Sequence, residues 1–160
     1  MGDVDEFTLL IRGYLKAYRW RRIDPVPWAP LQKPLSECRL ALVSSAGFVL
    51  PEQEPFDESV RGGDVSFRRI PSDSPVAELI DTHRSDSFDH TGMDRDPNLA
   101  FPIDRARELV ASGRIDSVAD SHLSFMGAIT TPGRLVRDTA LQAARWLVDQ
   151  RIDIALLVPV

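Results

Sequence analysis

Residues 148–160 read VDQRIDIALLVPV, and this stretch decides the fold class. Its second half, residues 154–160, is apolar after the aspartate, which is typical of a strand that is buried on both faces of a sheet. The preceding helix pattern places its apolar side chains on one face, at Val136, Ala140, Ala143 and Leu147. A helix that leads directly into a buried strand is a typical unit of an α/β sheet.

Other stretches predict the same class. Residues 38–48, CRLALVSSAGF, join a short apolar run to a turn of small residues, as in a buried parallel strand. Residues 101–113, FPIDRARELVASG, have helical spacing and end at a glycine. A weaker period-two pattern at residues 64–71 indicates another strand, and residues 118–127 are ambiguous. We therefore expect an α/β fold, a three-layer sandwich with a mostly parallel sheet.

The N-terminal part has a different composition. Apolar residues recur at spacings of three and four over residues 5–22, which predicts a helix. Residues 24–34 then contain four prolines and read as an extended connector. We expect residues 1–34 to hold this helix and connector. Residues 35–160 should form the α/β domain, which we expect to be incomplete at its C-terminus because no helix follows the last strand to cover it.

Composition excludes several classes of protein. The net charge of −5 argues against a dedicated nucleic-acid binder, which normally presents a basic face. No apolar run approaches the roughly 18 residues that a membrane span needs. The acidic start, MGDVDEF, is unlike a secretory signal, and Cys38 as the single cysteine excludes an internal disulfide. We expect a cytoplasmic protein without nucleic-acid or membrane partners.

Residues 81–98 are strongly polar and predict a long loop. This loop carries a dense set of titratable side chains: His83, Asp86, Asp89, His90, Asp94 and Asp96. Such a set could bind a metal ion or supply acid and base groups, or it could be a solvated loop with Asx turns. We expect no metal site, because the two histidines are seven residues apart and lack the spacing of familiar zinc motifs.

Four stretches together resemble one family. They are WAPLQKPLSECRLALVSSAGF, GGDVSFRRIP, DRDPNLAFPIDRARELVASGRIDSVADSHLSFMG and DIALLVPV. They are similar to the selenoprotein B component of the glycine/sarcosine/betaine/D-proline reductases, from about Trp28 to Val160. The resemblance implies a role in reductive cleavage of a carbon–nitrogen bond, with a thiol redox system as the electron source.

The resemblance also implies that more chain follows. In that family, the strand resembling ALLVPV leads directly into a segment with selenocysteine or cysteine. We therefore expect these residues to be the N-terminal part of a reductase subunit, ending where a UGA codon was read as termination, and inactive alone. The chain itself would hold no cofactor, and the selenocysteine would lie downstream of Val160.

Candidate site residues follow from the resemblance and from local pattern. His122 and His90 are the candidate catalytic residues, with His122 as proton donor to the leaving amine. The candidate residues lining the substrate site are Ser44, Ser45, Asp94, Asp96 and Asn98. Other interpretations remain open: His122 could be a hydrogen-bonded core residue, and the two serines could form a tight turn after a strand.

Two other functions stay open. The chain could be a non-catalytic α/β subunit or binding module, or a small metal-dependent enzyme that uses the His/Asp loop. An uncovered last strand would also leave a sheet edge exposed, and such edges pair with other chains. We therefore expect a homo-oligomer, and other reductase subunits as possible partners.

Overall fold

The structure is a computed structural model that describes residues 8–18, 22–85 and 90–160. It divides into two compact units, Met1–Pro30 and Leu31–Val160. The first unit contains α1 (Leu9–Ala17), which confirms an N-terminal helix within the expected range. Its apolar side chains are exposed, including Leu9, Leu10 and Tyr14. None of the described helices has both the length and the apolar character to cross a membrane.

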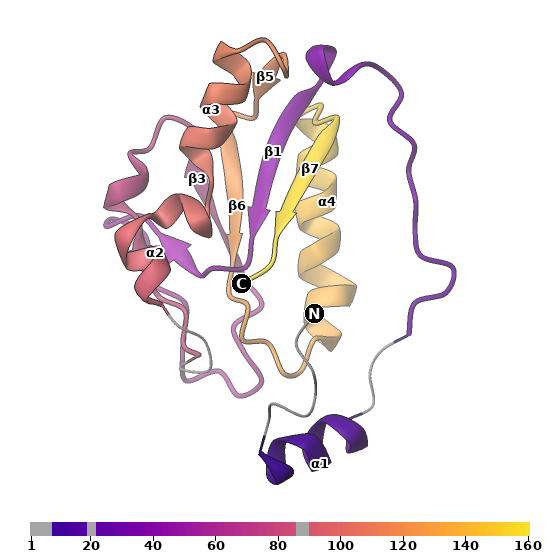
Figure 1. The fold of residues 1–160 in the computed structure, drawn as a ribbon, viewed down its shortest axis with the longest axis vertical. Helices are drawn as coiled ribbons and strands as arrows, with labels where there is room; N and C mark the ends of the chain where they lie inside the picture. Colours follow the sequence, from indigo (N-terminus) through magenta and orange to yellow (C-terminus); the bar gives the residue numbers. More distant parts are fainter. Residues whose placement is uncertain (1–7, 19–21, 86–89) are drawn as a thin grey trace. The chain divides into compact units, whose positions relative to one another are not determined.

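The second unit is built on one sheet around the central strand β1 (Figure 1). Three strands pair with β1 in parallel, and β3 joins the far side of β6 in antiparallel orientation. The strand bounds are β1 (Arg39–Ser44), β3 (Phe67–Pro71), β5 (Ser117–Val118), β6 (Ser121–Phe125) and β7 (Ile154–Val158). The mostly parallel sheet predicted from the sequence is thus confirmed.

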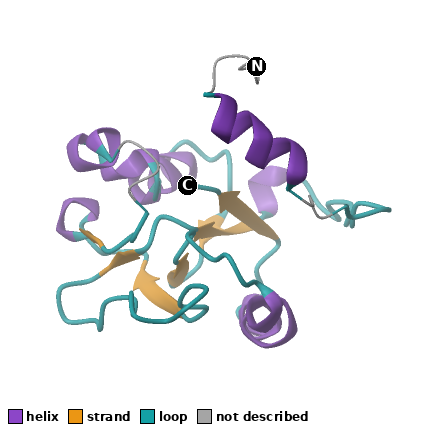
Figure 2. Ribbon diagram, turned by 90° about the horizontal axis from the view of Figure 1, so that it is seen from below, coloured by secondary structure: helices purple, strands orange, loops and turns teal. Residues whose placement is uncertain are grey.

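Helices lie on both faces of this sheet, as Figure 2 shows in a view turned by 90°. On one face, α3 (Ile103–Ala111) packs Ile103 and Ala106 against a cluster that includes Leu42 of β1. On the other face, α4 (Ala140–Asp149) packs Ala143 against Leu123 of β6. These three layers confirm the predicted sandwich.

The remaining elements are short. Two of them, β2 (Phe48–Val49) and β4 (Ile80–Asp81), form a separate antiparallel pair. The others are η2 (Leu35–Glu37), η3 (Val76–Glu78), α2 (Thr91–Arg95), η4 (Pro97–Leu99) and the π-helical η5 (Leu135–Thr139). The prediction of an irregular loop over residues 81–98 was therefore partly wrong, because β4, α2 and η4 lie within it or overlap it. Short polar helices lack the apolar periodicity that would reveal them.

The prediction that the last strand is fully buried was wrong. β7 pairs along its whole length with β1, and no second strand partner is found for it among the described residues. Leu156 and Leu157 point to opposite faces, and 44% and 68% of their surfaces are exposed. The sequence of β7, IALLV, has the apolar composition of a strand buried inside a sheet. Within the described residues, however, β7 lies at the edge of the sheet.

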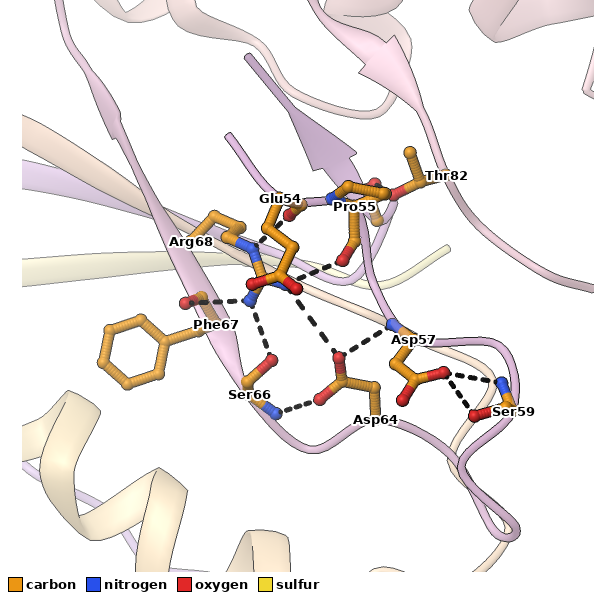
Figure 3. Close-up of polar contacts among 10 residues, drawn as sticks. Glu54, Pro55, Asp57, Ser59, Asp64, Ser66, Phe67, Arg68 and Thr82 are labelled. Atoms are coloured by element: carbon orange, nitrogen blue, oxygen red, sulfur yellow. Dashed lines mark hydrogen bonds and ion pairs between the residues drawn. The ribbon is translucent and has the colours of Figure 1, made fainter. Parts of the chain in front are cut away.

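A single arginine organises the segment between β2 and β3, as Figure 3 shows. The Arg68 guanidinium donates to the carbonyls of Glu54 (2.7 Å) and Pro55 (3.0 Å) and lies 4.4 Å from the centre of the Phe56 ring. Further along, the carbonyl of Gly62 accepts backbone hydrogen bonds from Thr130 and Thr131, at 2.9 and 3.1 Å. This segment is thereby tied to the chain that follows β6.

Candidate functional site

Four residues meet where the parallel strands β1, β6 and β7 end. A Cβ atom added at Gly127, just after β6, would lie 2.8 Å from His83 Nε2, 2.8 Å from the Ser45 carbonyl and 2.9 Å from a main-chain oxygen of Val160. These three atoms are therefore within about 6 Å of one another. We call Ser45, His83, Gly127 and Val160 the strand-end site, which lies where open α/β sheets bind ligands.

A glycine turn brings His83 to this position. Gly47, which follows β1, has a φ of +71°, a conformation that residues with a side chain rarely adopt. Its N–H donates to the Phe125 carbonyl (2.8 Å), and its own carbonyl accepts from the N–H (3.2 Å) and hydroxyl (2.6 Å) of Thr82. A Cβ at Gly47 would also lie 3.0 Å from the His83 backbone. The turn thus holds the chain after β4 against the end of β1.

Hydrogen bonds fix the end of β7 to Ser45. The Ser45 N–H donates to the Val158 carbonyl at 3.1 Å, and the Val160 N–H donates to the Ser45 hydroxyl at 2.9 Å. Ser44 has a different environment: it is 1% exposed, and its hydroxyl donates to the Ala100 carbonyl at 2.6 Å. The structure therefore places Ser45 in the strand-end site and holds the Ser44 hydroxyl on the Ala100 carbonyl, while both serines line the apolar cavity described below.

His90, a candidate catalytic residue, lies beside His83, with the two ring centres 6.1 Å apart. Its Nδ1 is 2.5 Å from a carboxylate oxygen of Asp81, and its Nε2 is 2.9 Å from the Ser85 carbonyl. Both partners accept hydrogen bonds, so the doubly protonated ring suits them best. The Ser85 carbonyl and the Asp81 carboxylate accordingly raise the pKa of His90 above its usual value.

The pKa of His83 is shifted in the opposite direction from that of His90. Burial lowers its pKa; the Asp81 carboxylate opposes this effect, while His90 and Arg84 add to it. The Ser85 N–H donates to His83 Nδ1 at 3.2 Å, so the neutral ring carries its hydrogen on Nε2. The site therefore pairs two imidazoles whose pKa values are shifted in opposite directions, and the Nε2 atom of His83 lies close to Gly127.

His122, the other candidate catalytic residue, lies on β6 inside the core and is fully buried. Its Nδ1 accepts the Leu42 N–H at 3.2 Å, and its ring meets the Phe101 ring edge-on at 6.2 Å. Burial, and to a smaller extent Arg107, lowers its pKa to about 4, so it is neutral near pH 7. The contacts described for it involve no residue of the strand-end site, and its catalytic role stays a prediction.

Two of the candidate lining residues belong to a network at the start of α3. Asp96 accepts from the Asn98 N–H at 3.0 Å, and the Asn98 amide donates to Asp104 at 3.0 Å. Asp104 in turn accepts from Arg107, whose guanidinium also donates to the carbonyls of Ser72 and Ser74. Asp96 thus caps η4, and Asn98 also accepts the Asp104 N–H in the first turn of α3, at 3.1 Å. Lining of a substrate site remains a prediction for both residues.

The remaining residues of the polar stretch are placed as follows. Asp94 is exposed on α2, whereas Asp86 and Asp89 lie outside the described residues. Within the described part of the chain, no group of three or more His, Cys, Asp or Glu side chains is arranged to hold a metal ion.

An apolar cavity of about 580 Å³ adjoins the strand-end site. Ser45 and Gly127 line both, and the cavity continues between the sheet and the helical segment η5–α4, past Leu135 and Leu157. Sequence reasoning missed this cavity and the part played by Gly127. The available signal was a glycine directly after a strand, which often marks a close approach of other groups.

Comparison with known proteins gives one family. Residues 9–159 match the model of the glycine/sarcosine/betaine reductase selenoprotein B family. The D-proline reductase subunit gamma of Acetoanaerobium sticklandii is 33% identical over 136 residues, which cover 84% of this chain and 54% of that protein. The sarcosine reductase complex component B subunit beta of Peptoclostridium acidaminophilum is 32% identical over 123 residues, 69% of this chain and 25% of that protein.

The chain thus spans about half the length of the first of these relatives and a quarter of the second. No solved structure matches it. The family match includes α1 and every described strand and helix of the α/β unit. It also includes Ser45, His83 and Gly127 of the strand-end site, but ends one residue before Val160. On this basis, the chain belongs to the glycine/sarcosine/betaine reductase selenoprotein B family.

Proposed function

We propose that this chain is the amino-terminal α/β portion of a reductase subunit that cleaves a carbon–nitrogen bond reductively. Its substrates are small amines of the glycine, sarcosine, betaine or D-proline type, as the names of the family and of the relatives suggest. A selenocysteine or cysteine follows in the segment that continues from β7. The observation that carries the proposal is the strand-end site, where Ser45, His83 and Gly127 surround the end of β7.

The position of the site supports this proposal physically. The carboxyl ends of parallel strands are where α/β proteins place reactive groups. Because Ser45 binds the N–H of Val160, the end of β7 is held near His83, whose Nε2 lies within about 6 Å of the Val160 main-chain oxygen. His90, whose pKa is raised by the Ser85 carbonyl and the Asp81 carboxylate, lies beside His83, and a nearby positive charge favours a thiolate or selenolate over its protonated form.

The exposed faces of β7 support a longer protein as well. Leu156 and Leu157 expose apolar surface on opposite sides of the strand. In a longer subunit, the following α/β segment would cover these faces and pair with the open edge. The 160 residues alone would then lack both the selenium or sulfur atom and the α/β segment that completes the site. We therefore expect them not to catalyse the reductive cleavage on their own.

The test of this proposal is the gene beyond the codon for Val160, together with the mass of the protein from its native source. We expect UGA at or soon after that codon, an open frame that encodes further α/β chain, and a mass that includes it. A different stop codon would refute the proposal, as would a UGA followed by no in-frame sequence with selenocysteine or cysteine chemistry.

Partners follow from the same proposal. Both relatives are named as subunits, one of them of a reductase complex. We propose that the full-length subunit works together with other reductase subunits and takes electrons from a thiol redox system. Purification from the native source should yield a complex whose mass exceeds that of the subunit and which reduces one of the amines above. A subunit that purifies alone and is fully active would contradict this part.

A further inference from the structure

A second cavity, of about 480 Å³, is lined by the chain at the start of β3 and by the helical segment η5–α4. It shares no lining residue with the apolar cavity beside the strand-end site. Its apolar lining comes from Val60, Val65 and Phe67, and its polar lining from Asp64, Ser66, Arg69, Arg134, Thr139 and Gln142. No residue of the strand-end site is among them, so the function proposed above gives this cavity no role.

The π-helical turn η5 brings two of these polar side chains together. At its end, the Ala140 N–H bonds to the Leu135 carbonyl, five residues back. Side chains five residues apart therefore lie nearly one turn apart in η5, whereas in an α-helix they would point about 140° apart. Arg134 and Thr139 have this spacing, and both line the cavity. Single π-helical turns within α-helical segments are frequent at functional sites.

Several hydrogen-bond donors line the cavity without an acceptor. Thr139 is only 8% exposed, and its hydroxyl has no hydrogen-bond partner among the described residues. Within the same part of the chain, no carboxylate pairs with the guanidinium of Arg134 or of Arg69. The Arg69 guanidinium carbon lies 5.9 Å from the centre of the Trp146 ring, which fixes its position beside α4. Donors that line one cavity in this way suit a ligand with several oxygen acceptors.

The carboxylate that lines the cavity, that of Asp64, is already engaged (Figure 3). It accepts the Ser66 N–H at 2.8 Å and the Asp57 N–H at 3.0 Å, and it lies 4.0 Å from the Arg68 guanidinium. Because Arg68 matches the charge of Asp64, the two other arginines leave the cavity with an excess of positive charge. Arg69 and Arg134 are both exposed, so a ligand can reach them from solvent.

We propose that this cavity binds a small organic oxyanion, whose carboxylate or phosphate group lies between Arg69 and Arg134. The flat guanidinium fork matches both groups in a bidentate manner. The Thr139 hydroxyl and the Gln142 amide donate to the remaining oxygens, and the organic part lies against Phe67. A volume of about 480 Å³ is in the range of small-molecule sites. The binding is non-covalent and requires no residue beyond those described.

The experiment is an NMR titration of the whole chain with three probes that share one ring: phenyl phosphate, benzoate and uncharged benzyl alcohol. The indole N–H signal of Trp146, assigned with Trp146→Phe, reports on the cavity because Arg69 lies beside that ring. We expect saturable shifts with phenyl phosphate or benzoate and none with benzyl alcohol. The affinity for the anion should fall as sodium chloride is added, because salt screens the charges. The tighter of the two anions identifies the preferred group.

Two variants locate the binding. Arg134→Gln removes one charge from the cavity and keeps a polar side chain, and we expect the dissociation constant of the anion to increase about tenfold. Arg145→Gln is the matched control: it removes the same charge from α4, but Arg145 does not line the cavity, so the constant should not change. Melting temperatures show whether both variants are folded.

Three results would overturn the inference. The first is the absence of saturable binding for both anions. The second is an equal loss of affinity in Arg134→Gln and Arg145→Gln, since the attraction would then come from overall charge. The third is benzyl alcohol binding as tightly as the anions, which would leave no role for the two arginines. Anion binding that Arg134→Gln weakens and Arg145→Gln does not supports the proposed site.

Discussion

The three histidines of this chain occupy three different electrostatic environments. His122 is enclosed by apolar core and accepts a backbone N–H, so it stays neutral. His90 lies between two acceptors and favours the charged form. His83 is half-buried beside His90 and favours the neutral form. The sequence places His83 and His90 in one polar stretch, but their opposite behaviour depends on burial, which residue spacing does not reveal.

These environments predict an order of titration. Because burial disfavours a charge and acceptors favour it, the pKa values should increase in the order His122, His83, His90. We expect His122 near 4, His83 below the usual 6.5 and His90 above it. NMR titration of ring resonances measures all three, with the single variants His83→Gln and His90→Gln for assignment. A His90 that titrates below His83 would contradict the assigned charge states.

His122 also makes stability depend on pH. Its pKa is about 4 in the folded protein and near 6.5 in the unfolded chain, so the unfolded state binds more protons between these values. Its contribution is fully present above pH 6.5 and is lost as pH falls towards 4, by about 3 kcal/mol. Urea unfolding of wild type and His122→Gln should show their difference in stability changing by this amount. A difference that is constant with pH would refute the prediction.

At the scale of elements, the start of α3 is held by one side chain. Arg107 donates to the carbonyls of Ser72 and Ser74, at 2.6 to 2.9 Å, and to Asp104 at 2.7 Å. It thereby joins the helix to the end of β3. Asp104, in the first turn of α3, takes part in this link because its carboxylate accepts a hydrogen bond from Arg107.

Removal of this side chain should weaken the link between α3 and β3. We expect Arg107→Ala to lower the free energy of unfolding by about 2 kcal/mol, because the partly buried carbonyls of Ser72 and Ser74 lose charged donors. Arg105→Ala is the matched control on the same helix: its pair with Glu108 is exposed, and we expect a change below about 0.5 kcal/mol. Chemical denaturation compares the two, and equal effects would contradict the assigned role of Arg107.

The elements with strong local signals were predictable from sequence. β1 has a continuous apolar run, and α3 has helical spacing with a glycine stop, Gly113, at a φ of +67°. β5 and β6 remained ambiguous because the stretch from Val118 to Gly127 mixes polar and apolar residues without a clear period. The strand-end site could not be predicted, since it depends on how Gly47 and Gly127 bring distant backbone segments together.

At the scale of the whole molecule, the open edge of β7 predicts self-association of the 160-residue chain. Among the described residues, one edge of β7 has no strand partner, and such an edge with exposed apolar side chains is a template for pairing with a second copy. We expect wild type to form dimers or larger species at micromolar concentration in sedimentation analysis. Leu157→Lys should shift the equilibrium to monomer, because a charge at the edge opposes pairing.

The control for this prediction is Val148→Lys on α4. Val148 is 73% exposed and apolar, like Leu157, but it does not lie on the strand edge. The Val148→Lys substitution should therefore leave the association of the chain unchanged. If both variants dissociate equally, general surface hydrophobicity is the cause, and a wild type that is monomeric throughout the range would refute the role of β7.

Cys38, at the opposite end of β1, is fully buried, with its sulfur 3.2 Å from the Pro34 carbonyl, and burial raises its thiol pKa. A thiol-specific reagent therefore reaches it only when the start of the sheet opens. The rate of its slow modification in native buffer would therefore report how often this end of the sheet opens locally.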